Sequence, residues 1–279
     1  MGKFAKYLLV SDFDRTLTDH KGDIPQANLD AIRYFMDEGG AFTISTGRSL
    51  PMARYRFQDI PMNAPLLVYN GAMCYDLKTN ETLFCYGMPE SVMPLMQYYE
   101  QAYPDLRFEV HGIDKHYVFH ENKFCDEFLD SQHADYAYVP WSEVPQPVLK
   151  FILSTRAEDF FSAKPGSETD RFFEALTQDI RKRGGEDYYV LHSLPNMVEV
   201  QVAGTSKGIS ARELARDLHR PILVCAGDAV NDETMLVEAD LAFMPADGDP
   251  MLLAKGYRRA AHSQEGTIAD IIRQLEAGL

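Results

Sequence analysis

Short apolar segments alternate with helical patterns in the first 86 residues and again after residue 195, and a segment of different texture separates the two stretches. Such alternation favours a parallel sheet with crossover helices. The separating segment is rich in Tyr, Phe and His and mixes helices with strands of alternating polarity. We therefore expect an α/β protein, with a doubly wound parallel sheet built from 1–86 and 196–279 and an inserted α+β domain at 87–195.

The pattern of apolar and turn residues places the expected elements along the chain. In the core, the pattern predicts strands at 6–11, 41–45, 66–69, 222–226 and 241–244, helices at 25–38, from about 49, at 207–218, 232–239 and 267–275, and a hairpin at 72–86. In the insertion, it predicts helices near 90–102, 122–132 and 168–182 and strands near 107–111, 116–120, 148–154 and 188–193. A strand at 197–202 is assigned to the returning core.

The composition excludes several classes of protein. A net charge of −15 makes a basic surface for nucleic acid a poor first hypothesis. The longest apolar runs are far shorter than the roughly 18 residues of a membrane span, and the first residues lack the apolar core of a signal peptide. Four cysteines without CxxC spacing fit a reducing compartment. We expect a cytoplasmic protein with no nucleic-acid or membrane partner, and the sequence leaves its oligomeric state open.

Acidic residues gather directly after two of the predicted core strands. Asp12 and Asp14 follow the first strand, and Asp228 and Asp232 follow the strand that ends at Ala226. Taken alone, an Asp-x-Asp pair is more often only part of a turn. Because the carboxyl ends of parallel strands share one edge of the sheet, however, the four acids are expected to converge, and their repulsion demands a cation. Clustered carboxylates without Cys or His are suited to Mg²⁺.

Two further motifs offer groups that bind anions. Thr46 supplies a hydroxyl after the second strand, and Gly47 bares an N–H that an anion can approach at a helix start, although Ser and Thr are also ordinary N-caps. Lys207 opens a late helix, where acids are favoured, so a shared anion explains this lysine better than solvation does. The chain has neither GxxxxGK[ST] nor a GxGxxG after a strand. An anionic ligand is therefore expected, but no P-loop.

Taken in order, DxDxT at 12–16, TGR at 46–48, the lysine at 207 and GDxxND at 227–232 resemble the motifs of the haloacid dehalogenase (HAD) superfamily. The nearest group is the Cof-like, type IIB sugar-phosphate phosphatases, in which an α+β cap is inserted between the second and third motifs. The resemblance implies a Rossmann-like core with a cap of type C2. The chain departs from the pattern at Arg15, where Gly is usual, and at Pro245-Ala246, where Asn-Ala is common. Arg15 would place a bulky cation near the pocket mouth.

The resemblance implies a role for each motif residue. Asp12 resembles the nucleophile that forms an aspartyl-phosphate, and Asp14 the group that protonates the leaving alkoxide and then activates water. Mg²⁺ would be held by Asp12, the backbone carbonyl of Asp14 and Asp228, with Asp232 acting behind them or through a water. Thr46 and Lys207 would stabilise the transferred phosphoryl group. The residues that would contact substrate are Gly47, Arg48, Asn231 and Arg15.

The inserted cap is expected to close over the core site, exclude water and supply specificity. His116 and His120 have the spacing of a helical metal pair, but Tyr117-Val118-Phe119 between them is strand-like, so the pattern does not favour zinc. One stretch of the cap holds several cationic and imidazole side chains, most of which we expect to be solvated: Arg107, His111, Lys115, His116, His120 and Lys123.

The sequence thus predicts a Mg²⁺-dependent phosphoric monoester hydrolase for a small phosphorylated metabolite such as a sugar phosphate. Two alternatives stay open, namely a phosphomutase or phosphotransferase of the same superfamily, and a non-catalytic phosphosugar sensor on a retained fold. The sensor is disfavoured because Asp12 and Lys207 are both present. A dehalogenase is disfavoured because its reaction needs no Mg²⁺, which would leave GDxxND without a purpose.

Overall fold

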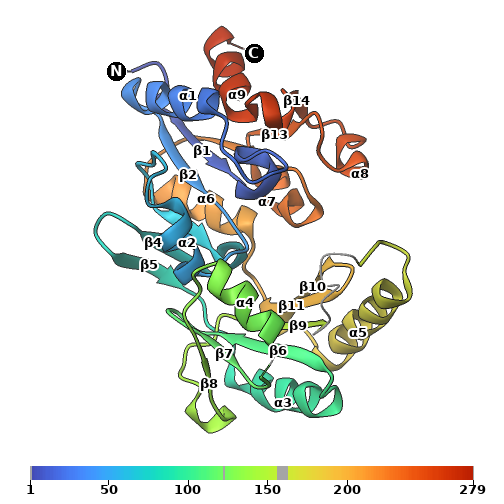
Figure 1. The fold of residues 1–279 in the computed structure, drawn as a ribbon. Coiled ribbons are helices and arrows are strands. Elements are labelled where there is room, and N and C mark those ends of the chain that lie inside the picture. Colours follow the sequence, from blue (N-terminus) through green and yellow to red (C-terminus); the bar gives the residue numbers. More distant parts are fainter. Residues whose placement is uncertain (1, 122, 156–162, 279) are drawn as a thin grey trace. The chain divides into compact units, whose positions relative to one another are not determined.

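The computed structural model describes residues 2–121, 123–155 and 163–278, and the chain forms two compact units (Figure 1). The first unit consists of Met1–Gly47, Phe57–Cys85 and Thr205–Leu279, and the second of Arg48–Arg56 and Tyr86–Gly204. An interrupted core with an inserted unit is what the change of sequence texture predicts. The boundaries differ from the predicted 87–195, because residues 48–56, 86 and 196–204 also belong to the second unit.

A parallel five-stranded sheet forms the centre of the first unit. Its strands run in the order β14-β13-β12-β1-β2, and all neighbours are parallel. Their bounds are Tyr7–Ser11 (β1), Ala41–Ile44 (β2), Ile222–Ala226 (β12), Leu241–Pro245 (β13) and Arg258–Ala260 (β14). Ser11 lies opposite Ile44 on one side and Ala226 on the other, so three strands end at one level. The predicted doubly wound α/β fold is confirmed.

Helices cover both faces of this sheet. Figure 1 shows α1 (Gln26–Asp37) and α9 (Thr267–Ala277) on one face, and α6 (Lys207–Asp217) and α7 (Glu233–Glu238) on the other. A small antiparallel sheet of β3 (Leu66–Val68), β4 (Met73–Asp76) and β5 (Glu81–Cys85) continues past β2 through a parallel bridge between Ser45 and Leu67. The sequence analysis missed α8 (Pro250–Leu253) and β14, which are too short to show a period.

A six-stranded sheet in the order β10-β11-β9-β6-β7-β8 forms the second unit. Its strands are β6 (Leu106–His111), β7 (His116–Val118), β8 (Tyr136–Tyr138), β9 (Lys150–Thr155), β10 (Tyr188–Leu194) and β11 (Met197–Val202). The assignment of residues 197–202 to the core is corrected here, because β11 pairs with both β9 and β10. Strand β8, with three residues, was not predicted.

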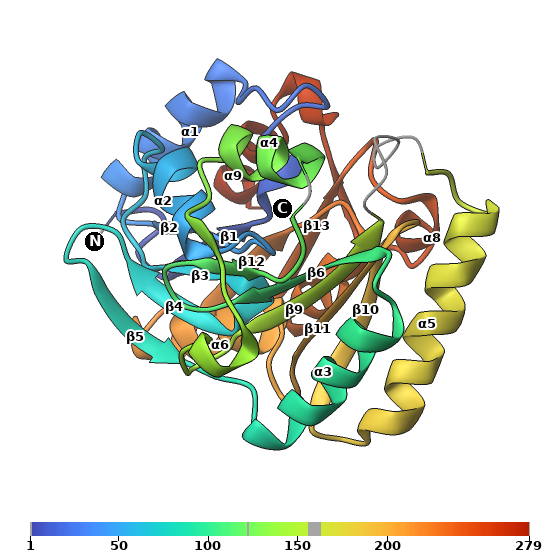
Figure 2. The same ribbon diagram turned by 60° about the horizontal axis from the view of Figure 1, so that its bottom comes forward.

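The two faces of this second sheet differ in character. Helices α3 (Met93–Ala102) and α5 (Glu168–Gly184) lie along one face (Figure 2), where Phe108, Phe151 and Phe173 belong to a continuous apolar core. Helix α4 (Lys123–Ser131) packs over Val118 at the β7 end of the other face, together with α2 (Leu50–Phe57). Met52 of α2 contacts this α4 cluster, which explains why most of α2 belongs to the second unit although the sequence placed it in the core.

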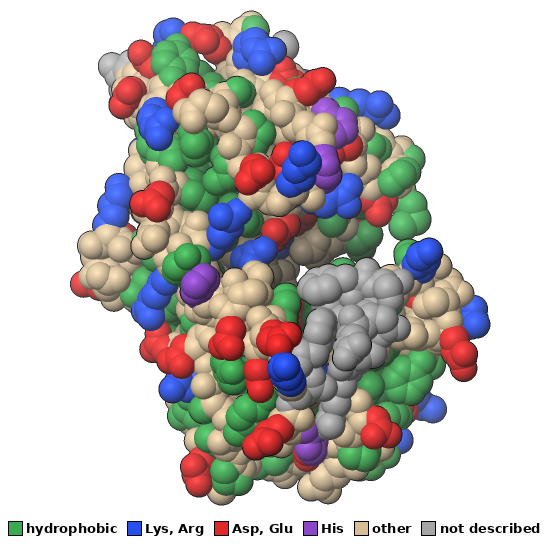
Figure 3. Space-filling view, viewed as in Figure 1, with side chains coloured by type: hydrophobic (Ala, Val, Ile, Leu, Met, Phe, Trp, Pro, Cys, Tyr) green, Lys and Arg blue, Asp and Glu red, His purple; other side chains and the backbone are tan. Residues whose placement is uncertain are grey.

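The surface mixes both signs of charge. On the face drawn in Figure 3, Lys and Arg side chains are interspersed with Asp and Glu over both units. In the part of the chain that the structure describes, no helix is both long enough and apolar enough to pass through a bilayer.

Candidate active site

Three predicted motifs meet at one edge of the parallel sheet. The N–H of Asp12 donates to the carbonyl oxygen of Ala226 at 2.8 Å, so the residue after β1 lies beside the end of β12. On the other side, the N–H of Ser45 donates to the Ser11 carbonyl oxygen at 2.9 Å. The backbone pairing of three parallel strands thus fixes where the following side chains begin. Asp12 and Asp228, separated by more than 200 residues, come together for this reason.

Lys207 joins two of the acids. Its Nζ lies 2.5 Å from Oδ1 of Asp12 and 2.6 Å from Oδ1 of Asp232, and its side chain is only 1% exposed. Ser206 caps α6 by accepting the N–H of Ile209 at 3.2 Å, which starts the helix so that Lys207 occupies its first turn. The lysine at the helix start thus pairs with two carboxylates of the protein itself, and the anionic ligand expected beside it stays a prediction.

Asp232 orders the loop that follows β12. Its Oδ2 accepts the N–H groups of Asp228 and Ala229, each at 3.0 Å, while Oδ1 accepts Lys207. A Cβ on Gly227 would lie 2.4 Å from the Cβ of Asp232, so only glycine permits this close turn. Both oxygens of Asp232 already accept hydrogen bonds, which fits a residue that positions its neighbours.

Asp228 has a further partner that the sequence analysis did not assign. Oγ1 of Thr16 donates to Oδ1 of Asp228 at 3.1 Å, and Thr16 is fully buried. Thr16 is the threonine of the DxDxT motif, so the motif itself was the signal. The hydroxyl orients the carboxylate and leaves Oδ2 of Asp228 for another ligand.

The electrostatics of this cluster call for a cation. Burial, and then the charge of Asp232, raise the pKa of Asp12 well above its usual range. The same two causes raise the pKa of Asp228 to about 6. Burial alone would lower the pKa of Lys207, but the charges of Asp12 and Asp232 outweigh it and raise that pKa.

Oxygens of Asp12, Asp228 and Asp232 lie within 4.8 Å of one another, close enough to share one metal ion. Hard carboxylate oxygens in this arrangement fit a divalent cation such as Mg²⁺.

Asp14 and Arg15 follow Asp12 in an exposed turn. Arg15 has φ 63° and ψ 8°, a left-handed conformation that glycine adopts freely and that costs another residue about 1 kcal/mol. The usual glycine of the family pattern is thus explained by the backbone. The charge of Arg15 favours the ionised form of Asp228 and so acts against the rise in its pKa that burial and Asp232 cause. The predicted part of Asp14 in metal binding rests on its backbone carbonyl, since its side chain is exposed.

The other predicted substrate contacts lie at separate places. Thr46 is buried at the end of β2, where its N–H donates to the carbonyl oxygen of Leu67 at 2.9 Å. A Cβ on Gly47 would lie 2.8 Å from Oδ1 of Asn70, so Asn70 belongs to this region although no role was assigned to it. Arg48 lies in the second unit and donates to Oε1 of Gln132 at 2.8 Å. Asn231 is half-buried next to Asp232.

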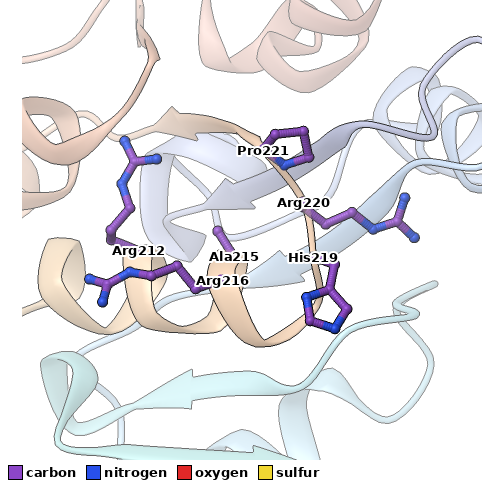
Figure 4. Close-up of a pocket in the computed structure, with 6 residues that line it drawn as sticks. All are labelled: Arg212, Ala215, Arg216, His219, Arg220 and Pro221. Atoms are coloured by element: carbon purple, nitrogen blue, oxygen red, sulfur yellow. The ribbon is translucent and has the colours of Figure 1, made fainter.

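A cavity of about 400 Å³ lies away from these motifs, at the end of α6 and the start of β12 (Figure 4). Its basic lining serves the fold. Arg212 donates to Oδ2 of Asp240 at 2.9 Å, and Arg220 donates to the carbonyl oxygen of Gly39 at 2.9 Å. Figure 4 shows these two guanidinium groups pointing apart, so they do not converge on one ligand. The remaining lining residues are Ala215, Arg216, His219 and Pro221.

A family model described as haloacid dehalogenase-like hydrolase matches residues 9–272. The chain belongs to this family. Among curated relatives of this HAD-like hydrolase is the 5-amino-6-(5-phospho-D-ribitylamino)uracil phosphatase YitU of Bacillus subtilis, 19% identical over 277 residues that cover 96% of this chain and 97% of the relative. The predicted superfamily and enzyme class, a phosphoric monoester hydrolase, are confirmed at this level.

Solved structures share the fold of this HAD-like hydrolase. A haloacid dehalogenase-like hydrolase from Bacteroides thetaiotaomicron has a TM-score of 0.80 at 15% identity, and 96% of this chain and 99% of that chain are covered. A sugar phosphatase of HAD subclass IIB has a TM-score of 0.77 at 19% identity, with 97% and 99% covered. These likenesses confirm the predicted Cof-like architecture.

Proposed function

We propose that this HAD-like hydrolase is a Mg²⁺-dependent phosphatase of small phosphorylated metabolites, with sugar phosphates as its substrate class. The observation that supports this most directly is the buried set of Asp12, Asp228, Asp232 and Lys207 at the carboxyl edge of the parallel sheet. Three carboxylates with one ammonium suit a site that receives a cation together with a phosphate.

Asp12 is the proposed nucleophile. Its carboxylate oxygen forms a bond to phosphorus as the ester oxygen leaves in line, and Asp14 gives a proton to that leaving oxygen. Asp14 then takes a proton from water, which attacks the aspartyl-phosphate and releases inorganic phosphate. Lys207 at 2.5 Å favours the ionised form of Asp12 and lies beside the position of the incoming phosphoryl group.

The ion would be held by Asp12, Asp228 and the backbone carbonyl of Asp14. When bound, it neutralises charge on the phosphoryl oxygens as the bond changes. Thr16 and Asp232 act on the protein side by fixing Asp228 and its loop. Thr46 and Gly47, after β2, offer a hydroxyl and an N–H to the phosphoryl oxygens, as the motif predicts.

The substrate class draws on the relatives. One of them is named as a sugar phosphatase and another as a phosphatase of a phosphorylated ribitylaminouracil. Both names describe a phosphate on a hydroxylated carbon chain. At these identities a shared class of substrate is proposed rather than the same compound.

The test is a phosphate-release screen over hexose phosphates, pentose phosphates and phosphorylated ribityl compounds. One series contains about 5 mM Mg²⁺, enough for an ion that is loosely held, and the other contains EDTA. We expect release of inorganic phosphate without any acceptor, and only in the Mg²⁺ series. Phosphate that appears solely on an added hydroxyl acceptor would favour the phosphotransferase alternative. Equal release in EDTA would contradict the dependence on metal.

A further inference from the structure

One face of the second unit's sheet buries charge where the sequence predicted solvated side chains. Along β6, Phe108 and Val110 face the apolar core, and the alternate residues Arg107, Glu109 and His111 are buried as well, each at most 4% exposed. The expectation that most of the six cationic and imidazole side chains of this stretch are solvated is therefore wrong for Arg107, His111 and His116. Paired strands and the covering helices α2 and α4 enclose this face in the second unit.

Glu109 is the centre of the buried group. Arg107 forms an ion pair with its Oε1, while Nε2 of His111 and Nδ1 of His116 lie 3.1 and 3.3 Å from its Oε2. Burial alone would raise the pKa of Glu109, but Arg107 and the two histidines outweigh it and hold that pKa well below its usual range. Glu109 is therefore an anion, held by Arg107 on one oxygen and lying beside the two imidazole rings on the other.

The other side of the His116 ring contacts Ser49. Oγ of Ser49 and Nε2 of His116 lie 2.7 Å apart and form a hydrogen bond, in which the tautomer of the ring decides which atom donates. The result is a continuous buried path from Ser49 through His116 to Glu109.

The group is poorly arranged for a metal ion, although its ligand atoms are close together. The rings of His111 and His116 stack with centroids 3.7 Å apart and planes 13° apart. A metal binds imidazole nitrogen in the plane of the ring, and no single ion lies in two parallel planes. Arg107, paired with Glu109, adds a positive charge at the same place.

The order of serine, histidine and carboxylate is also that of a catalytic triad. Ser49 is 1% exposed, however, so its hydroxyl does not meet an external ester. Its place in the chain suggests a different use. Ser49 directly precedes α2, its carbonyl oxygen accepts the N–H of Ala53 at 2.9 Å, and it lies three residues after Thr46.

We propose that His116, oriented by Glu109, is a positioning residue that anchors Ser49 and thereby fixes the Thr46-Gly47-Arg48 loop for phosphoryl transfer. The role in transfer rests on the proposed phosphatase function. The anchor holds the chain immediately after the residues that offer a hydroxyl and an N–H to phosphate. Helix α2 is also held by Arg54, which pairs with Asp114 at 2.7 Å, and by Tyr55, which stacks on His133. Of these three contacts, that of Ser49 is the nearest to the loop along the chain.

The first experiment compares His116→Phe with His111→Phe, each matched in ring size, strand pairing and loss of one contact to Glu109. In a p-nitrophenyl phosphate assay with Mg²⁺, we expect His116→Phe and Ser49→Ala each to lower kcat about tenfold with KM nearly unchanged, because the loop contributes mainly to the transition state. His111→Phe should keep kcat within about twofold. Ser49→Ala removes the same contact without changing any residue of the sheet. The contact can therefore still be tested if His116→Phe does not fold.

A double-mutant cycle and a conservative variant then test the contact itself. Ser49→Ala should have little further effect on His116→Phe but its full effect on His111→Phe. His116→Gln, whose amide oxygen can accept the serine hydroxyl, should recover at least about half of the lost kcat. Additive effects of Ser49→Ala and His116→Phe, or an equal loss in His111→Phe, would overturn the proposal.

Amide hydrogen exchange decides the anchor independently of catalysis. Residues 46–53 should exchange about tenfold faster in Ser49→Ala and His116→Phe than in the wild type or His111→Phe. If the wild type hydrolyses no phosphate ester, the proposed function fails while this comparison still decides the anchor. Unchanged exchange in both variants overturns the anchor whatever the activity.

Discussion

Among the described residues, the first unit buries Asp12, Asp228 and Asp232 with one ammonium, that of Lys207, which leaves a formal charge of −2. On the polar face of the second unit, Glu109 pairs with Arg107 and Glu199 pairs with Lys150. The pKa of Asp228 is accordingly raised, and that of Glu109 is held low. Burial is nearly equal in the two groups, so it does not explain the difference. The balance of charge does.

This contrast sets the cluster proposed as the active site apart from one whose charges are already balanced. In the second unit, Lys150 lies 2.8 Å from Glu199, and burial lowers the pKa of His111 to about 3, so that His111 is neutral. Among the described residues of that face, these carboxylates already have their counter-charges. In the first unit, a bound cation would supply the missing positive charge of the proposed site.

The largest effect is expected from Asp12→Asn. An amide cannot form the acyl-phosphate, so turnover of p-nitrophenyl phosphate should fall at least about a thousandfold. Circular dichroism should show an intact fold, because Asn keeps the size of the side chain. Asp37→Asn, an exposed acid at the end of α1, is the control and should be as active as the wild type. Turnover by Asp12→Asn at the wild-type rate would refute the nucleophile.

Lys207→Met and Lys150→Met each leave buried carboxylates without their lysine. Both should lower the free energy of unfolding by about 4 kcal/mol in EDTA, the usual order for breaking a buried ion pair from one side. Mg²⁺ should restore stability only to Lys207→Met, since Asp12 and Asp232 then gain another cation, whereas Glu199 does not. Thermal denaturation with and without Mg²⁺ measures this. Equal rescue of both variants would remove the proposed difference between the clusters.

Asp228→Asn and Glu109→Gln should change stability in opposite directions. The folded pKa of Asp228 is about 6, above the ordinary 3.8, so the folded state binds the proton more tightly and loses stability as pH rises between these values. In EDTA at pH 7, Asp228→Asn should therefore stabilise the protein by about 3 kcal/mol, and the gain should disappear below about pH 4.

Glu109 has a lowered folded pKa, so its contribution is present above the ordinary value of 4.5 and is lost as pH falls. Glu109→Gln should accordingly destabilise the protein at pH 7. Urea unfolding at pH 7 and pH 4 measures both variants. A loss of stability in Asp228→Asn at pH 7 without metal would contradict the charge imbalance.

The candidate site was predictable because its signals are contiguous in sequence and sit at strand ends. Asp12 and Asp228 each follow a run of buried residues, and parallel pairing brings such ends together without any help from side chains. The position of Lys207 predicted that it is a site residue, but the sequence did not predict its carboxylate partners. The contact of Lys207 with Asp232 depends on the loop after β12, and Asp232 itself orders that loop.

The polar face of the second unit was not predictable in this way. Alternating polarity in β6 indicates one apolar face and one solvated face for an ordinary antiparallel sheet. Here α2 and α4 cover part of the polar face, and its charges find partners on other strands. Glu199 of β11 and Lys150 of β9 are 49 residues apart, so no local pattern reports their pairing. Contacts between residues far apart in sequence also assign β11, through its pairing with β9 and β10, and α2, through Met52, to the second unit.

The smallest expected effect tests whether buried hydroxyls in the first unit serve the metal or only the fold. Thr16 donates to Asp228, and Thr43 donates to the carbonyl oxygen of Pro65 at 2.7 Å. Replacing either by the isosteric Val removes one buried hydrogen bond, so Thr16→Val and Thr43→Val should each cost about 1 kcal/mol of stability. Only Thr16→Val should raise the half-saturating Mg²⁺ concentration, by about tenfold, because a partner that orients a metal ligand affects affinity. A Mg²⁺ titration of phosphatase activity separates the two. Identical Mg²⁺ dependence would mean that the hydroxyl of the DxDxT motif stabilises the turn without orienting Asp228 for the ion.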